Sequence, residues 1–85
     1  MHIELRKISD VNPYANNPRR NDHAVEAVAR SIAEFGFRQP IVVAEDGVII
    51  VGNTRYKAAV RLGLETVPVH VAKGLTSAQI KAYSI

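Results

Sequence analysis

The stretch Val48-Ile-Ile-Val-Gly-Asn-Thr-Arg-Tyr-Lys-Ala-Ala59 passes from an apolar strand pattern into a helical pattern through a single glycine. Its β-branched residues predict a buried strand, and the residues from about Thr54 to Leu62 predict a helix that Gly63 ends. The first amides of a helix have no partner within it, and the helix dipole favours negative charge there. Gly52 lets a ligand approach the backbone closely. The stretch therefore predicts an anion site where this helix begins.

Side chains in the first turn of this helix favour phosphate as the anion. Asn53 and Thr54 can add hydrogen-bond donors, and Arg55 can bind two phosphate oxygens at once. The Gly-Lys-Ser/Thr signature of a Walker loop is absent. A plainer interpretation is also open, in which Gly52 makes an ordinary turn, Asn53 caps the helix and Arg55 lies in solvent.

The N-terminal residues predict a strand followed by a loop. Polar and apolar residues alternate over residues 2–8, which predicts a half-buried strand with Ile3, Leu5 and Ile8 facing inward. Residues 9–18 are rich in Asn and Pro and predict an ordered loop with room for a short helical turn.

A first helix is expected to begin at Asp22, which can cap it, and to end at Gly36. Phe37 is expected to pack in the protein interior rather than to stack on a base. Gln39 precedes a proline, which favours extended backbone, and its side chain can serve either a ligand or the turn. The helix carries apolar residues at three- and four-residue steps, which predict one core-facing stripe: Val25, Val28, Ile32 and Phe35.

The central and C-terminal residues predict three strands and another helix. Residues 41–44 and 48–51 predict an antiparallel hairpin, because the Asp46-Gly47 pair between them favours a tight turn. Residues 67–72 predict a strand that lies at a sheet edge or begins at Pro68, because Pro68 cannot donate a ladder hydrogen bond.

Thr76-Ser-Ala-Gln79 is a capping box that starts a third helix, about two turns before Ile85. The whole chain of 85 residues is expected to form one α+β domain, cut from a longer protein. The predicted order is β-α-β-β-α-β-α, with helices packed against a small mixed or antiparallel sheet.

Composition narrows the classes of function. The net charge of +3 favours anionic partners, including nucleic acid. The absence of cysteine excludes disulfides, thiolate metal sites and a cysteine nucleophile, and the three histidines lack ligand spacing, so no metal site is predicted. No apolar run approaches the roughly 20 residues that span a bilayer. We therefore expect a cytoplasmic protein without a membrane partner.

Two pairs of basic residues are candidates for phosphate or DNA contacts. Arg19 and Arg20 follow a proline-stiffened loop and can close over a bound phosphate or contact a DNA backbone. Lys57 and Arg61 lie one helical turn apart and can meet nucleic-acid phosphates. Solvated surface is the alternative for both pairs.

Four segments, taken together, resemble the ParB N-terminal domain family, within a superfamily that also contains sulfiredoxins and a free-serine kinase. The resemblance covers nearly the whole chain, in order. The segments are Asn12–Arg20, Ala29–Val43, Gly52–Ala59 and Leu62–Val69.

The resemblance implies a nucleoside triphosphate with Mg²⁺: CTP in partition proteins, ATP in the kinase and sulfiredoxin branches. It implies that the family's phosphate-holding box is Gly52-Asn53-Thr54-Arg55, that its loop arginine is Arg19 or Arg20, and that its Gly-x-x-Gln-Pro piece is residues 36–40.

This chain departs from the partition proteins within the box, where Asn53 replaces the usual Glu and Thr54 the usual Arg. The departures leave the identity of the nucleotide and its hydrolysis open, and the form of the box is closer to the phage and methyltransferase-associated branch. The lack of cysteine excludes sulfiredoxin activity.

The leading hypothesis is a nucleotide-binding, DNA-associated regulatory module of the partition type. The alternatives are an enzyme of the same superfamily, either a nuclease or a phosphoryl-transfer enzyme such as a weak nucleotide hydrolase, and a homodimerising structural module with a vestigial pocket. No clustered carboxylates that would hold Mg²⁺ for catalysis are evident in the sequence.

Overall fold

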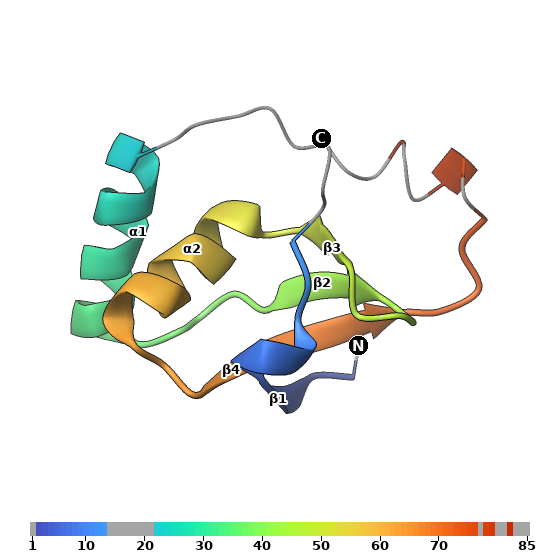
Figure 1. Cartoon of the computed structure of the whole chain (residues 1–85), viewed down its shortest axis with the longest axis horizontal. Coiled ribbons are helices and arrows are strands. Elements are labelled where there is room, and N and C mark those ends of the chain that lie inside the picture. Colours follow the sequence, from blue (N-terminus) through green and yellow to red (C-terminus); the bar gives the residue numbers. More distant parts are fainter. Residues whose placement is uncertain (1, 14–21, 77, 80–81, 83–85) are drawn as a thin grey trace.

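A computed structural model of the chain describes residues 2–13, 22–76, 78, 79 and 82. The strands form a single sheet, and the two long helices lie next to each other (Figure 1). In chain order the elements are β1 (Glu4–Lys7), the short 3₁₀ helix η1 (Ile8–Asp10), α1 (Asp22–Phe35), β2 (Ile41–Ala44), β3 (Ile49–Val51), α2 (Asn53–Leu62) and β4 (Thr66–Ala72).

The sheet is mixed and has the order β1-β4-β2-β3. β1 with β4 and β2 with β3 pair antiparallel, whereas β2 and β4 pair parallel. Ala59 places α2 against the sheet, and Ala58 on the same helix packs against Val25 and Ala29 of α1. The prediction of an α+β domain with a small mixed sheet is confirmed. The sheet side of the core consists of Val11, Ile41, Val43, Ile49, Ala59, Val67 and Val69.

The β2–β3 hairpin turns at Asp46 and Gly47, as predicted. The Asp46 carboxylate accepts a hydrogen bond from the Val48 amide at 3.0 Å, and Gly47 has a φ of +88° that favours glycine. The loop after η1 runs beside this turn, where Asn12 accepts from the Ile49 amide at 2.8 Å. The prediction of an ordered loop with a helical turn is confirmed as far as residue 13.

The expected edge position of the last strand is wrong, because β4 lies between β1 and β2. The alternative that the strand begins at Pro68 is wrong as well, because β4 begins at Thr66. Pairing with β2 begins at Val69 opposite Ile41, one residue after Pro68. On the β1 side, the Ile8 amide donates to the carbonyl of Glu65, which lies opposite it. Hydrogen-bonded and non-hydrogen-bonded pairs alternate along an antiparallel ladder. Pro68, opposite Leu5, therefore belongs to a pair that makes no hydrogen bonds with β1. An interior strand therefore accommodates this proline without losing a pairing bond.

The predicted orientation of the first strand is wrong for Ile3 and Leu5, which are 49% and 73% exposed. The register pairs Glu4 with Val69 and Arg6 with Val67. Because paired residues share a face of the sheet, the two charged residues lie on the core side and the apolar ones on the other. Ile8 does pack against the core, as predicted.

The helix α1 begins at Asp22 and stops before Gly36, whose φ is +84°, as predicted. Asp22 is itself helical, so the expectation that it caps the helix is wrong. Phe35, however, is 61% exposed rather than part of the core. At 3.6 residues per turn, Phe35 lies about 80° around the helix from Val25, at the margin of the stripe that faces α2. Phe37 packs against the core instead, which confirms its predicted role.

The capping box near the C-terminus is confirmed by reciprocal hydrogen bonds. The Thr76 amide donates to Gln79 Oε1 at 2.8 Å, and the Gln79 amide donates to Thr76 Oγ1 at 3.2 Å. Ala78, Gln79 and Ala82 are helical. Among the helices of the described residues, none has the length and apolar character that crossing a membrane requires.

Candidate functional site

The helix α2 begins without a side-chain cap from any described residue. Gly52 occupies the N-cap position with φ +111° and ψ +26°, and its carbonyl accepts from the Tyr56 amide at 2.9 Å. Asn53 is already the first helical residue, so the interpretation that it caps the helix is wrong. The amides of the first turn are therefore available to an anion, and the helix dipole adds attraction.

Gly52 is confined by its surroundings as well as by its conformation. A Cβ at this position would lie 3.4 Å from Cα and Cγ1 of Ile41 and 3.4 Å from Nη1 of Arg55. These distances are tight for a real Cβ, and a φ of +111° strains any residue with a side chain. Ile41 of β2 and the guanidinium of Arg55 can therefore lie this close to the backbone of residue 52 only because that residue is glycine.

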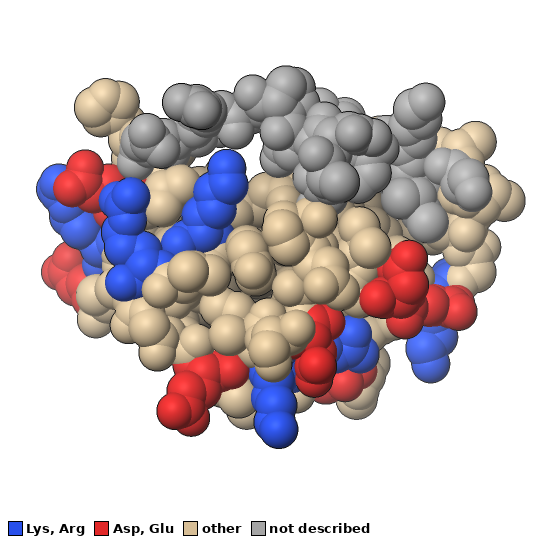
Figure 2. All heavy atoms as spheres, viewed as in Figure 1, with Lys and Arg blue, Asp and Glu red and all other residues tan. Residues whose placement is uncertain are grey.

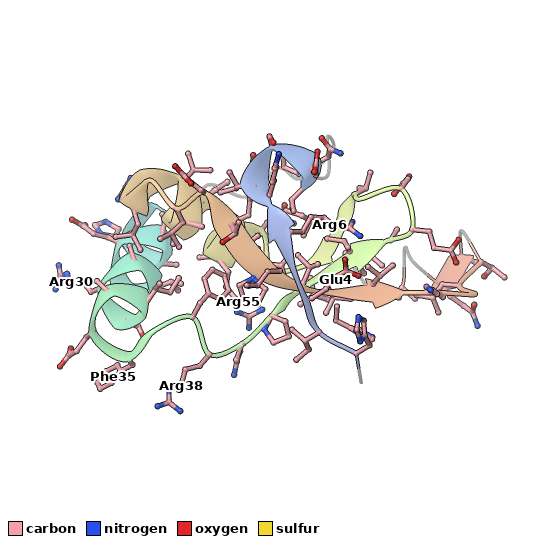
Figure 3. All side chains as sticks on the ribbon, turned by 90° about the horizontal axis from the view of Figure 1, so that it is seen from below. Glu4, Arg6, Arg30, Phe35, Arg38 and Arg55 are labelled. Atoms are coloured by element: carbon pink, nitrogen blue, oxygen red, sulfur yellow. The ribbon has the colours of Figure 1, made fainter. Side chains whose placement is uncertain are left out.

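The side chain of Arg55 folds back over the start of its own helix. It is half-buried, and its Nη2 donates a hydrogen bond to Oε1 of Gln39. Figure 3 shows Arg55 beside the segment between α1 and β2, along which Arg38 also lies. The guanidinium is thus held near the free amides, which contradicts the alternative that Arg55 points into bulk solvent.

A groove of about 490 Å³ opens between the last turns of α1 and the start of α2. Its polar end contains Gln39 and Arg55, and its other end contains the exposed ring of Phe35. An aromatic face and a cationic corner in one groove suit a ligand that is part flat ring and part anion. The complete lining is Val28, Ser31, Ile32, Phe35, Gly36, Phe37, Arg38, Gln39 and Arg55.

The structure brings together most of the predicted phosphate residues. Gly52 precedes α2, whose first residues are Asn53, Thr54 and Arg55, and Gln39 is hydrogen-bonded to Arg55 and lines the groove with it. Arg19 and Arg20 lie outside the described residues. Within the described part of the chain, no three His, Asp or Glu residues gather as a metal-binding group.

Two further predicted residues, Lys57 and Arg61, lie exposed on α2. Arg30 is exposed on the neighbouring α1. Figure 2 shows that Lys and Arg side chains gather over the two helices on the face that it displays. On this face, the helical side of the domain therefore carries a basic surface.

Sequence reasoning missed Phe35 and Arg38 as residues of the groove. The signal that could have revealed Phe35 is its place in the last turn of α1, directly before the glycine that ends the helix. A helix that stops there leaves its final side chain without a facing element, so an aromatic ring at that position is a candidate for ligand contact.

Comparisons with known proteins agree with this architecture. The family model of the ParB N-terminal domain matches residues 1–85. The ParB-like nuclease domain-containing protein YnaK of Escherichia coli strain K12 is 40% identical over 82 residues, which cover 93% of this chain and 92% of that protein. Stage 0 sporulation protein J of Bacillus subtilis strain 168 is 35% identical over 71 residues, 78% of this chain but 25% of that longer protein.

Among solved structures, the C-terminally truncated chromosome-partitioning protein ParB from Caulobacter crescentus, complexed with CTP-γ-S, superimposes with a TM-score of 0.85 at 29% identity. All of this chain and 51% of that chain are covered. The same protein complexed to the centromeric parS site superimposes with a TM-score of 0.75, over 95% of this chain and 44% of that one. On its sequence and its fold, the chain belongs to the ParB N-terminal domain family.

Proposed function

We propose that this domain binds a nucleoside triphosphate, CTP or ATP, with its phosphates at the start of α2. The observation that carries the proposal is the first turn of α2, which no described side chain caps and which lies next to Gly52 and the guanidinium of Arg55. Free amides, a helix dipole and a half-buried cation converge on one corner, and each stabilises phosphate charge. The CTP-γ-S complex of the Caulobacter relative supports this choice of ligand class.

The groove that leads from this corner suits the rest of a nucleotide. Its volume of about 490 Å³ lies within the usual range of roughly 300–1,000 Å³ for small-molecule sites. With the phosphates at Arg55, the sugar and base extend past Gln39 toward the exposed ring of Phe35. Stacking on that ring would stabilise the base without selecting among bases.

Mg²⁺ fits this arrangement as a companion of the nucleotide. The ion keeps several waters and is commonly bound through substrate phosphates rather than by a dedicated protein cage. The residues that hold the phosphates, Gly52 to Arg55, would thereby hold the metal complex. The ion's chemical contribution would be neutralisation of phosphate charge. Arg19 or Arg20 would close over the phosphates, as the family resemblance implies.

We propose in addition that the domain is a DNA-associated regulatory module. Lys57 and Arg61 are exposed on α2, and Arg20, outside the described residues, is a further candidate from the sequence. Lysine and arginine contacts to phosphates bind DNA without regard to sequence. The partition relative in complex with parS supports a DNA partner for the family.

A thermal-shift panel of CTP, ATP, GTP and inorganic triphosphate, each with Mg²⁺, tests the nucleotide site. A ligand at 100 times its Kd adds about 2.7 kcal/mol of stability. For a domain of this size the midpoint should rise by about 10–20 °C. Absence of a shift with every nucleotide would refute the proposal.

Binding to a short duplex at several salt concentrations tests the DNA surface. The logarithm of the affinity should fall with the logarithm of the salt concentration, with a slope of about −0.9 per phosphate contact. Replacing Lys57 and Arg61 together by Gln should reduce the slope by about two contacts. A slope near zero for the unaltered protein would remove the DNA proposal and leave the nucleotide site untouched.

A further inference from the structure

We infer that Gln39 is a positioning residue. It orients the guanidinium of Arg55 toward the anion and, being neutral, does not cancel the positive charge with which Arg55 binds the anion. The inference rests on the proposed phosphate site. The hydrogen bond from Arg55 Nη2 to Gln39 Oε1 joins two residues that are 16 positions apart in the sequence. It places the guanidinium against Gly52, with Nη1 3.4 Å from where a Cβ would stand.

The chemistry of the pair fixes the orientation of the amide. Arginine has donors and no acceptor, so the oxygen of Gln39 must face Arg55. The Nε2 group, with two donors, is then directed away from Arg55, and Gln39 lines the groove. One side chain thus accepts from the cation and keeps donors for an anion.

The neutral charge of Gln39 is important because a carboxylate at this position would weaken anion binding by Arg55. A carboxylate in the same place would also orient the guanidinium, but it would cancel the charge on which phosphate binding depends. It would bring two acceptor oxygens and no donor toward the ligand. Glutamine orients Arg55 without neutralising its charge. Pro40, the next residue, restricts the Gln39 backbone to extended conformations.

Isothermal titration of the full chain with inorganic triphosphate tests this role. Gln39→Ala should weaken binding by about 5-fold, the loss of an orienting hydrogen bond. Gln39→Glu should weaken it by about 50-fold at pH 8, because a charge-assisted contact with the anion is lost as well. Gln79→Glu is the matched control, since it adds the same charge in the helical turn after β4, which lies at the opposite end of the molecule from α1 (Figure 1), and keeps the capping box.

The dependence on pH separates positioning from a merely structural role. Anion binding favours protonation of the new carboxylate, so the penalty of Gln39→Glu relative to the unaltered protein should shrink as the pH falls from 8 to 5.5. A double variant adds a second criterion: Gln39→Ala should cost less when Arg55 is already Ala, because the two residues act together.

The outcomes distinguish this inference from the proposed function. Failure of the unaltered protein to bind triphosphate or any nucleotide would overturn both. Normal binding by the unaltered protein, with Gln39→Ala equally tight, would overturn the inference alone. A Gln39→Glu penalty that does not change with pH, or that Gln79→Glu reproduces, would do the same.

Discussion

A glycine with positive φ flanks each end of α2, but the two glycines differ in their hydrogen bonds and in the atoms around them. At the C-terminal end the Gly63 amide donates to the carbonyls of Ala59 and Val60, and a Cβ there would meet nothing within 4 Å. At the N-terminal end Gly52 is pressed against Ile41 and Arg55, and no described side chain caps the helix.

The difference indicates which end is built for a ligand. The C-terminal end satisfies its own backbone groups, so its glycine serves the turn alone. At the N-terminal end no described side chain caps the donors, and the guanidinium of Arg55, which also lines the groove, lies against Gly52. Crowding around a glycine, rather than glycine itself, therefore distinguishes the functional end of the helix from the structural one.

The largest expected effect comes from Gly52→Ala. Strain at φ +111° and the contact with Ile41 should lower the free energy of unfolding by about 2–4 kcal/mol. The displaced guanidinium should also abolish triphosphate binding. Urea denaturation and calorimetric titration measure the two effects, and a variant that is stable and binds normally would show that Gly52 is an ordinary turn.

Arg55→Ala should cost about 1.5–3 kcal/mol of triphosphate binding free energy, the value of a hydrogen bond to a charged group. Stability should hardly change, because the side chain is only half-buried. Arg61→Ala is the matched control at the other end of the same helix and should leave triphosphate affinity unchanged. Equal losses in the two variants would mean that only general positive charge matters.

Phe35→Ala should weaken nucleotide binding by about 1 kcal/mol, at the lower end of what an aromatic side chain contributes by stacking on a base. Inorganic triphosphate has no base, so its affinity should be the same in the variant. Val60→Ala removes another exposed apolar side chain, 54% accessible, and is the control. Equal weakening of both ligands by Phe35→Ala would place the base elsewhere.

The smallest effect on ligand binding is expected from Gly63→Ala. Open space around the position leaves only the left-handed conformation to resist a Cβ, at about 1–2 kcal/mol of stability. Nucleotide and triphosphate affinities should stay as they are. Weaker phosphate binding by this variant would mean that the two ends of α2 are not independent.

Local signals predicted the elements that have local causes. The Asp46-Gly47 pair specified the hairpin, and Gly52 marked the entry to α2. The capping box at Thr76 was equally readable, because its hydrogen bonds link residues three apart.

The features that depend on partners far along the chain could not be predicted in the same way. Leu5 faces outward because of its register with β4, and Pro68 is tolerated inside the sheet for the same reason. The exposure of Phe35 depends on where α2 packs along α1, and the Gln39–Arg55 contact depends on how the loop after α1 meets α2. Alternation and spacing carry no information about such pairings.

Backbone amide NMR of the full chain during a titration with CTP, and separately with ATP, measures the central claim most directly. Bound phosphate should shift the Asn53, Thr54 and Arg55 amide signals most strongly, while the Gly63 amide stays in place because its donor is already used. Largest shifts away from the start of α2, or unchanged amides there at saturation with either nucleotide, would contradict the account.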